Sequence, residues 1–445
     1  MGSALDADDR QDRLIARAAQ IIPGATFDEL VLPEPVAIIP RRASGSRLHD
    51  VAGREYIDYT LGGGSLILGH AHPDVVAAVT EQARRGSAYA MLSEPLLELS
   101  EMLVGAIPCA EQVLFTATGA EATYVALRLA RAATGRPRIL KFAGGYHGFH
   151  DVGIVNVTSP SEGPAPAAES SGIPPHVLED VVVAPFNAIE RTASLIEAHH
   201  QSLAAIIVEP VQRVLTPRPE FLAMLREESR RWGIVLIFDE VVTGFRFDYR
   251  GAQGLYGVIP DLATYGKVLG GGYPLSAVVG RGDLLSLANP RGGPAAISGS
   301  QHGNAVAAAA GLATLRHLGR AESFERLRQV AALTEDTLKK ALAAAGVGGR
   351  VVVLGPVWHV LPLDTGEGPF FDHPSSLPAD PRRAEAVITA LSLQVTRHGV
   401  LAFPRPRRGY LRGYLSLAHS DDDIRATGER LYESMVGMAG VQGGG

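Results

Sequence analysis

The sequence predicts an α/β fold, with one large domain around a mostly parallel sheet and a smaller α+β domain after it. Residues 203–208 and 233–238 are almost entirely apolar, as expected of strands buried on both faces of a parallel sheet. Each run is followed by an acid, Glu209 or Asp239, at the edge where open α/β sheets place their ligands. After about residue 320, long helical patterns alternate with shorter strand candidates. We therefore expect two kinds of domain in one chain.

These patterns divide the chain into three segments. We expect residues 1–75 to form an N-terminal helix and hairpin that pack with the small domain. Residues 76–320 form the expected large domain, and residues 321–445 form the small C-terminal α+β domain. The elements expected outside the large domain are helices over 10–22, 322–345 and 381–398, a hairpin over 46–59, and strands over 351–354 and 358–363.

Composition argues against several classes of partner. The chain has 445 residues, enough for a large core, and a formal net charge of −6 without a basic cluster, which argues against a nucleic-acid partner. Cys109 is the only cysteine, so an intrachain disulfide is excluded and a reducing compartment is favoured. No stretch approaches the roughly 18–20 apolar residues of a membrane span, and the first residues lack the apolar stretch of a signal peptide. We expect a soluble, cytoplasmic protein without a membrane partner.

Residues 261–274 place a single lysine between an apolar run and a turn. Lys267 is followed by Gly270, Gly272 and Pro274, which mark the turn. An amine that is held at a strand end and shielded from water loses proton affinity, and a neutral amine can attack a carbonyl carbon. The alternative is a surface lysine beside a loop, which is the commoner situation.

Asp239 ends the upstream apolar run and could serve a metal ion, a ribose or the nitrogen of a pyridine ring. At about 3 Å and an effective dielectric of about 20, a carboxylate and a pyridinium attract each other by roughly 5–6 kcal/mol before desolvation. A carboxylate here would keep such a ring protonated. A protonated ring withdraws electrons from the carbon bound to an imine, which is the chemistry of pyridoxal phosphate.

The motifs around these two residues resemble the class III aminotransferases of pyridoxal-phosphate fold type I, and within them the glutamate-1-semialdehyde aminomutase-like branch. The resemblance is carried by residues 237–246 (Ile-Phe-Asp-Glu-Val-Val-Thr-Gly-Phe-Arg) and 261–267 (Asp-Leu-Ala-Thr-Tyr-Gly-Lys), and it extends from about residue 46 to about residue 424. It implies that Lys267 forms the internal aldimine with pyridoxal 5′-phosphate and that Asp239 pairs with the pyridine nitrogen.

A Thr-Gly-Ala turn precedes a helical pattern over residues 125–133. The first N–H groups of a helix and its dipole suit a phosphate, whereas Thr118 could equally be an ordinary N-cap. The resemblance favours phosphate and implies a cup formed by Thr118, Gly119 and Ala120. Many relatives have a hydroxyl residue at the position of Ala120, so we expect backbone N–H groups to serve there.

Tyr146 stands between glycines in residues 144–148 (Gly-Gly-Tyr-His-Gly), after a short strand pattern. Such an aromatic could stack on a heterocycle or be a buried turn residue. The resemblance implies that Tyr146 covers one face of the cofactor ring and that Val241 packs against the other. We interpret His147 and His150 as structural or supporting residues.

Three further site residues rest on the resemblance. Glu209 by itself could be a site residue or an ion-pair partner, and the resemblance places it behind the residues that touch the cofactor, with Gln212 near the phenolic oxygen. Ser300 is implied to cross the subunit boundary and bind the cofactor phosphate of the other subunit, which implies a homodimer. The breaker-rich stretch 159–175 is either a disordered connector or an active-site loop.

Substrate residues are expected at three positions. Gly63 stands where the aminomutases have a tryptophan, so this pocket would be wider. The nearby His70 and His72 do not indicate a metal site, because no cysteine or acid lies at ligand spacing. Arg405 or Arg412 could hold a substrate carboxylate, since a guanidinium fork suits that group, and the alternative is a solvated basic loop.

The expected reaction is amino transfer from an amine or an amino acid, including β- and ω-amino acids, to a keto acid or aldehyde. Leu411 stands where the aminomutases have a glutamate, which favours an intermolecular aminotransferase over an aminomutase or racemase. Lys267 is expected to act as base and acid, assisted by Asp239 and Tyr146. A binding protein without catalysis is the alternative from another class, and no DNA-binding segment is visible to support a regulator.

Overall fold

The structure of the protein is a computed structural model, which describes most of the chain: residues 4–26, 32, 37–158, 165–363 and 381–442. The chain forms two compact units. The central unit contains Pro73–Arg320, and the terminal unit combines the chain before this stretch with the chain after it. We propose that these units are the domains expected from the sequence. Among the described residues, none of the helices combines the length and hydrophobicity that a membrane crossing requires.

The described part of the central unit is built on a seven-stranded sheet. β7 (Leu203–Val208), β8 (Val235–Asp239) and β9 (Leu262–Tyr265) pair in parallel, and the parallel pairing continues from β7 through β5 to β6. β10 (Ser276–Gly280) runs antiparallel to its neighbours β9 and β4. This mostly parallel sheet confirms the predicted fold class. The order is β4-β10-β9-β8-β7-β5-β6, with β4 (Gln112–Thr116), β5 (Arg138–Phe142) and β6 (Val181–Ala184).

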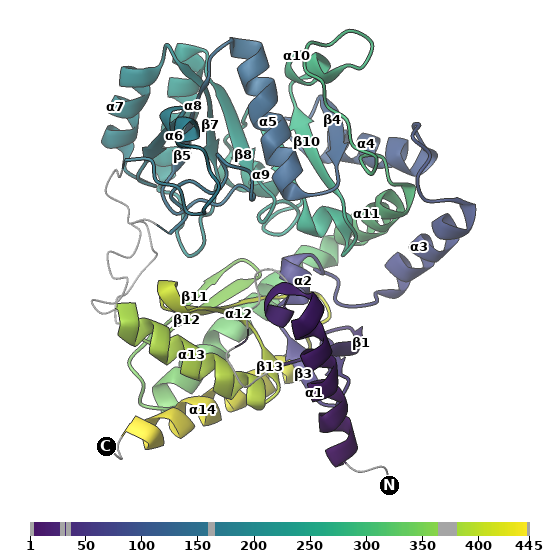
Figure 1. Cartoon of the computed structure of the whole chain (residues 1–445), viewed down its shortest axis with the longest axis vertical. Helices are drawn as coiled ribbons and strands as arrows, with labels where there is room; N and C mark the ends of the chain where they lie inside the picture. The colour runs from purple at the N-terminus through teal and green to yellow at the C-terminus, as the bar shows by residue number, and fades with distance from the viewer. Residues whose placement is uncertain (1–3, 27–31, 33–36, 159–164, 364–380, 443–445) are drawn as a thin grey trace. The chain divides into compact units, whose positions relative to one another are not determined.

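Helices bury the apolar strands of this sheet. α5 (Gly119–Thr134) places Ala126 and Leu129 in the same core as Ile207 and Ile237 of the sheet. In Figure 1, α5 runs in front of the sheet. The other elements of the unit are α3 (Pro73–Arg85), α4 (Glu94–Ala106), α6 (Pro175–Glu179), α7 (Ile189–His199), α8 (Pro219–Trp232), α9 (Gly251–Tyr256), α10 (Gly282–Leu285), α11 (Ala305–Leu318), and the 3₁₀ turns η2 (Lys267–Gly270) and η3 (Ser286–Ala288).

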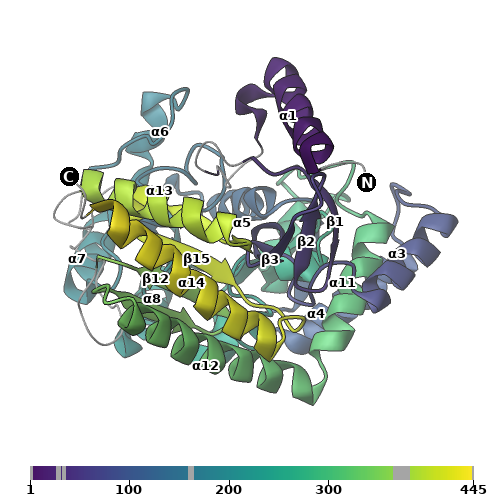
Figure 2. The same cartoon turned by 90° about the horizontal axis from the view of Figure 1, so that it is seen from below.

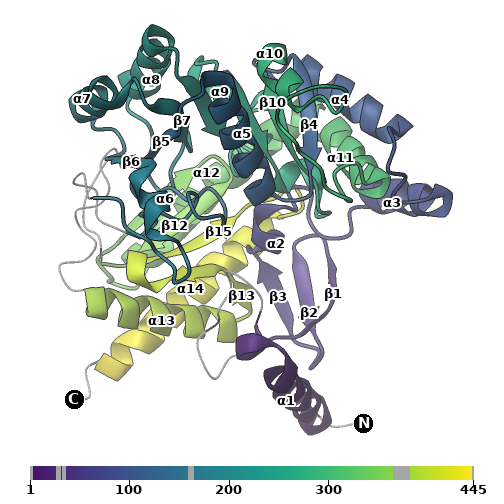
Figure 3. The same cartoon turned by 45° about the horizontal axis from the view of Figure 1, so that its top comes forward.

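The terminal unit contains two small sheets. β2 (Arg47–Asp50) and β3 (Glu55–Asp58) form the predicted antiparallel hairpin. β3 also pairs in parallel with β13 (Val400–Leu401), so hydrogen bonds join the N-terminal segment to the C-terminal one. Figure 3 shows β1, β2 and β3 side by side. The first sheet is completed by β1 (Pro40–Ser44), and the second has the order β11-β12-β15-β14, from β11 (Arg350–Leu354), β12 (Val357–Leu361), β15 (Tyr410–Tyr414) and β14 (Phe403–Arg405).

Long helices complete the terminal unit. Figure 2 shows α14 (Asp421–Gln442) between α12 (Ala321–Ala344) and α13 (Pro381–Arg397). Their apolar side chains share a core with Trp358 of β12. α12 and α13 agree within a residue with the helices predicted over 322–345 and 381–398, whereas the first helix, predicted over 10–22, begins at Ala4. The remaining elements are α1 (Ala4–Ile21), α2 (Leu61–Gly64), η1 (Pro23–Ala25) and η4 (Pro406–Arg408).

Candidate active site

Three neighbouring parallel strands end at the edge where the sequence predicts the site. Glu209 follows β7, Asp239 is the last residue of β8, and Lys267 lies two residues past the end of β9. Asp239 lies opposite Thr264 in the pairing of β8 with β9. Because the carboxyl ends of parallel strands meet at one edge of the sheet, the structure brings both predicted acids and the predicted lysine to the same edge.

The carboxylate of Asp239 is buried and held by three groups. Its Oδ1 atom accepts hydrogen bonds from the Thr264 hydroxyl (3.1 Å) and from the Val241 N–H (3.2 Å). Its Oδ2 atom lies 2.7 Å from Nδ1 of His147. The carboxylate therefore offers a charge in a set position to a ligand at this edge. His147, expected only as a supporting residue, contacts Asp239 directly.

Lys267 has an unusual backbone conformation. Its φ angle is +46°, in the left-handed region that non-glycine residues rarely adopt. Such a conformation costs on the order of 1–3 kcal/mol and is found most often at active sites and ligand clamps. The residue is half-buried, and its role in binding a ligand stays a prediction.

The other lysines of the chain are already engaged. The sequence contains four lysines: Lys141, Lys267, Lys339 and Lys340. Lys141 is buried against backbone carbonyl groups, and the two exposed lysines on α12 pair with acids one turn away. Within the described residues, the amine of Lys267 has no hydrogen-bond or ion-pair partner in the structure. It is therefore the lysine available to a ligand.

Val241 connects two segments of the predicted site. A Cβ atom added at Gly266, the residue before Lys267, would lie 3.3 Å from Cγ1 of Val241, and one added at Gly119 would lie 3.0 Å from the same atom. The Val241 side chain therefore contacts both the backbone that precedes the lysine and the first turn of α5. The predicted ring site and the predicted phosphate cup are neighbours.

The first turn of α5 confirms the N-cap interpretation of Thr118. Its hydroxyl accepts a hydrogen bond from the Glu121 N–H (3.2 Å), and the Glu121 carboxylate accepts one from the Thr118 N–H (3.0 Å). The helix leaves the N–H groups of Gly119 and Ala120 without intrahelical acceptors. The donors that α5 can offer an anion are therefore these two N–H groups and the Thr118 hydroxyl, because the Thr118 N–H is occupied.

Glu209 fixes the loop that carries Tyr146. Its Oε2 atom accepts a hydrogen bond from the Tyr146 N–H (3.1 Å), and its Oε1 atom accepts one from Nη1 of Arg213 (2.7 Å). The ion-pair interpretation of Glu209 is therefore confirmed, and its role as a site residue stays a prediction. Gly148, two residues past Tyr146, packs on α5, since a Cβ atom there would lie 2.6 Å from Cα of Ala120.

One acceptor atom of Gln212 is buried without a hydrogen-bond partner in the part of the chain that the structure describes. Its Nε2 atom donates a hydrogen bond to the carbonyl oxygen of Ala143 (2.6 Å). Its Oε1 atom is buried and has no hydrogen-bond partner among the described residues. Leaving such an acceptor unsatisfied costs about 1–3 kcal/mol, so its position points to a donor supplied by a bound molecule.

Two other predicted site residues, Ser300 and Gly63, belong to different units. Ser300 is exposed in the segment before α11 of the central unit. Gly63 belongs to the terminal unit, where it has a φ angle of +74° within α2. Residues 159–164 of the predicted active-site loop lie outside the described residues, so the interpretation of this loop stays a prediction.

Both predicted arginines lie beside aromatic rings of the terminal unit. Arg412 on β15 is buried, with its guanidinium carbon 5.5 Å from the centre of the Phe403 ring. The guanidinium carbon of Arg405 lies 5.2 Å from the centre of the same ring. A solvated basic loop describes Arg407, which is exposed, but it does not describe Arg412.

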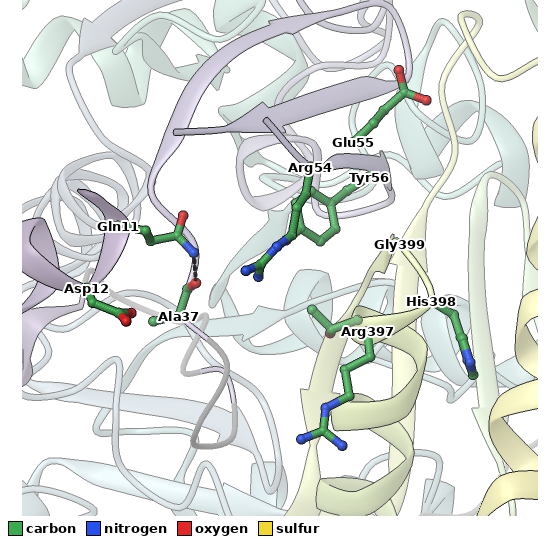
Figure 4. Close-up of a pocket in the computed structure, with 10 residues that line it drawn as sticks. Gln11, Asp12, Ala37, Arg54, Glu55, Tyr56, Arg397, His398 and Gly399 are labelled. Carbon is green, nitrogen blue, oxygen red and sulfur yellow. Dashed lines mark hydrogen bonds between the residues drawn. The ribbon is translucent and has the colours of Figure 1, made fainter. Parts of the chain in front are cut away.

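Two cavities in the structure are lined by none of the predicted site residues. A cavity of about 570 Å³ in the terminal unit is lined by residues that include Gln11, Arg54 and Arg397 (Figure 4). A second cavity, of about 600 Å³, lies in the central unit at the amino ends of β8 and β9, where Val235 and Asp261 line it. The predicted site is at the opposite ends of these strands, so we assign neither cavity to its chemistry.

Comparison with known proteins identifies the family. Residues 32–360 match the family model described as aminotransferase class-III. The chain belongs to the class III aminotransferases. It is 39% identical to a glutamate-1-semialdehyde 2,1-aminomutase from Roseiflexus castenholzii, over 94% of this chain and 95% of that one. An enzyme of the same name from Methanopyrus kandleri is 38% identical, over 96% of this chain and 97% of that one. The match to the crystal structure of an omega-transaminase from Sphaerobacter thermophilus has a TM-score of 0.87 and 36% sequence identity. This match covers 96% of this chain and 97% of the transaminase chain.

Class III aminotransferases are enzymes of fold type I that use pyridoxal phosphate. The predicted family, fold type and cofactor are therefore confirmed. The residues of this chain fit that cofactor on independent observations. The buried Oε1 atom of Gln212 has no donor among the described residues, and the first turn of α5 offers N–H groups to an anion. Val241 lies between that turn and the residue before Lys267.

Two buried charged residues near the site were missed as candidates. Glu240 follows Asp239, and burial raises its pKa. Its carboxylate accepts hydrogen bonds from the Thr243 hydroxyl (2.9 Å) and from the N–H of Gln253 (3.2 Å). Lys141 lies on β5, under the loop that carries the predicted aromatic residue. The signal in each case was a charge within or beside an apolar strand pattern, which signifies burial with a partner.

Proposed function

We propose that this chain moves an amino group on a small molecule, with Lys267 as the residue that binds pyridoxal phosphate. The observation that carries the proposal is the available, half-buried amine of Lys267 just past β9, beside the strand that ends in Asp239. An amine can bind an aldehyde covalently, and an adjacent carboxylate can hold a ring nitrogen in its charged form.

The residues around Lys267 have separate roles under this proposal. When bound, the cofactor supplies an electron sink for the substrate carbon. Asp239 presents its carboxylate to the ring nitrogen, and His147 keeps that carboxylate in place. Lys267 carries a proton at its Nζ atom to and from the substrate carbon. Tyr146 and Val241 enclose the ring from its two faces and exclude water.

Polar groups of the cofactor are matched by the remaining predicted residues. We propose that the N–H groups of Gly119 and Ala120 and the hydroxyl of Thr118 bind the phosphate. The amide of Gln212 pairs with the phenolic oxygen, which gives its buried Oε1 atom a donor when that oxygen is protonated. Glu209 acts through the backbone of Tyr146, which it holds.

We propose a homodimer in which Ser300 binds the phosphate in the other subunit. Ser300 is exposed and can be reached by a second copy. The large, exposed side chains of Met91, Leu92 and Phe149 in the same unit support an interface with that copy. Replacing Ser300 with Ala should weaken the binding of pyridoxal phosphate to the dimer, and an unchanged affinity would remove this role.

The names of the relatives favour an aminomutase over the intermolecular transfer preferred from the sequence. Two relatives reported above are named aminomutases of glutamate 1-semialdehyde, and each match covers at least 94% of this chain. The first candidate reaction is therefore a 1,2-shift of an amino group within one small amino aldehyde. The same acid, base and cofactor serve this reaction.

Transamination between two molecules is the second candidate, and two observations favour it. Leu411 is fully buried on β15, where the aminomutases have a glutamate, and it offers no hydrogen bond. The solved omega-transaminase covers almost the whole chain. Under this candidate, Arg405 or Arg412 holds a substrate carboxylate and Gly63 leaves room for a larger substrate.

A substrate panel tests the proposal and separates the candidates. The purified protein loaded with pyridoxal phosphate is incubated with glutamate 1-semialdehyde alone, and separately with amines or amino acids plus a keto acid. Isomerisation without an acceptor supports the aminomutase, and transfer that requires the keto acid supports the transaminase. Activity in neither arm, or equal activity in a Lys267→Ala variant, would overturn the proposal.

A further inference from the structure

Lys141 lies on β5 among apolar residues, and its side chain is completely buried. Its Nζ atom donates hydrogen bonds to the carbonyl oxygens of Gly145 (3.1 Å), Gly153 (3.0 Å) and Val155. An ammonium group has three N–H donors, so these three carbonyl groups use all of them. The burial of a charge here is compensated by a complete set of acceptors.

The three acceptors lie on both sides of the loop that carries Tyr146 and His147. Gly145 immediately precedes Tyr146, whereas Gly153 and Val155 follow the loop. One ammonium group therefore ties the start and the end of the loop to β5. The loop would lose all three bonds together if Lys141 lost its amine.

The peptide unit between Gly145 and Tyr146 is held from both sides by opposite charges. Its carbonyl oxygen accepts the bond from Lys141, and its N–H donates to Oε2 of Glu209 (3.1 Å). A peptide unit is planar, so two bonds on opposite sides fix its orientation. This orientation sets the direction in which the chain continues to Tyr146 and His147.

We propose that Lys141 is a positioning residue that sets Tyr146 and His147 for cofactor binding. The inference rests on the proposed function, because it takes the roles of these two residues from there. Lys141 itself acts only through the loop. His147 passes the effect to the buried carboxylate of Asp239, 2.7 Å away.

The three hydrogen bonds from Lys141 to the carbonyl groups of Gly145, Gly153 and Val155 form a clamp on the loop. The strength of this clamp should depend on pH. Burial lowers the pKa of Lys141 to about 7, while the charge of Glu209 raises it and that of Arg213 lowers it. Of the other groups that act on it, Glu169 is acidic, and burial lowers the pKa of His150 to about 4. A neutral amine has two N–H donors for three carbonyl groups. Raising the pH through about 7 should therefore weaken the clamp.

The variant Lys141→Met tests the inference, because it keeps a long buried side chain and removes every donor. We measure the affinity of the cofactor-free protein for pyridoxal phosphate and the visible circular dichroism of the bound cofactor, which reports the asymmetry of its surroundings. We expect the dissociation constant to rise about tenfold, because losing about one net hydrogen-bond contribution to binding changes an equilibrium constant by about that factor. We also expect the ellipticity to fall. The matched control Leu140→Met, on the adjacent position of β5, should retain the values of the unmodified protein.

The pH profile separates positioning from a general loss of stability. The ellipticity of the unmodified protein should fall between pH 6 and 8.5, and that of Lys141→Met should not change. Equal affinity and equal profiles in the two proteins would overturn the inference and leave the proposed function intact. Failure of the unmodified protein to bind pyridoxal phosphate would overturn the proposed function instead.

A second variant covers the case in which Lys141→Met does not fold. In Lys141→Arg the guanidinium keeps its proton at these pH values. Its ellipticity should therefore stay constant between pH 6 and 8.5 while that of the unmodified protein falls. The same fall in both proteins would overturn the inference.

Discussion

The central and terminal units carry predicted site residues in different ways. In the central unit, direct contacts connect the residues: Asp239 lies 2.7 Å from His147, and Val241 packs beside the residue before Lys267. In the terminal unit, Arg405 and Arg412 are arranged around an aromatic ring of their own sheet. Hydrogen bonds and packing thus form one connected cluster in the central unit, whereas the two arginines proposed to bind substrate share an aromatic ring within the terminal unit.

Removal of the lysine should give the largest effect on the connected cluster. We expect Lys267→Ala to lower turnover by about 10³–10⁴-fold or more, because both the covalent attachment and the proton transfer are lost. Turnover and the visible absorbance of the bound cofactor are measured together. Lys339→Ala, an exposed lysine paired with Glu335, is the control and should be unchanged. Retention of turnover in Lys267→Ala would mean that another residue serves.

Neutralising Asp239 should have the next largest effect. Asp239→Asn keeps the shape and removes the charge, and we expect turnover to fall about 10²–10³-fold, as for the loss of one fixed electrostatic group. The control is Asp283→Asn, which removes a surface carboxylate paired with Arg281. A loss of less than about threefold in Asp239→Asn would show that the ring nitrogen does not depend on this charge.

The two arginines of the terminal unit can be tested by substrate selectivity. Arg405→Ala should raise the KM for donors with a carboxylate about tenfold, because one charge-assisted contact is lost, and should leave simple amines unaffected. Arg412→Ala is measured in parallel, and the exposed Arg407→Ala serves as the control. Equal effects on carboxylated and simple donors would contradict a role in substrate binding.

The N-cap of α5 should contribute to the stability of the cofactor-free protein. Thr118→Ala removes the hydroxyl that accepts from Glu121, and we expect it to lower the free energy of unfolding by about 0.5–2 kcal/mol. Urea denaturation of the cofactor-free protein measures this change. Thr118→Ser retains the hydroxyl and should differ little from the unmodified protein. An unchanged midpoint in Thr118→Ala would contradict the capping interaction.

The thiol of Cys109 should be unreactive in the folded protein. Burial raises the pKa of Cys109 to about 12, so almost no thiolate is present at pH 8. A thiol reagent should modify the protein only after unfolding. Rapid modification of the folded protein would show that this end of the sheet opens readily.

Local patterns could predict the sheet edge but not the contacts across it. The apolar runs before Glu209 and Asp239 identified β7 and β8, and the glycines after Lys267 identified the turn. The contact of His147 with Asp239 joins residues 92 positions apart. It depends on the order of β5, β7 and β8 in the sheet, which periodicity does not contain.

Helix α5 shows a second limit of local patterns. The sequence predicts its apolar repeat from residue 125, but the helix begins at Gly119. Its first turn contains Glu121, a polar residue that interrupts the apolar repeat. The reciprocal hydrogen bonds between Thr118 and Glu121 stabilise this turn instead. Capping chemistry therefore predicts this boundary better than hydrophobicity does.

Chemical trapping of the cofactor tests the central claim most directly. The protein is loaded with pyridoxal phosphate, reduced with borohydride and digested, and the labelled peptide is identified by mass spectrometry. With only four lysines in the chain, the result is unambiguous. We predict one pyridoxyl label on the peptide that contains Lys267. A label on Lys141, Lys339 or Lys340, or no label on protein that has bound the cofactor, would contradict the account.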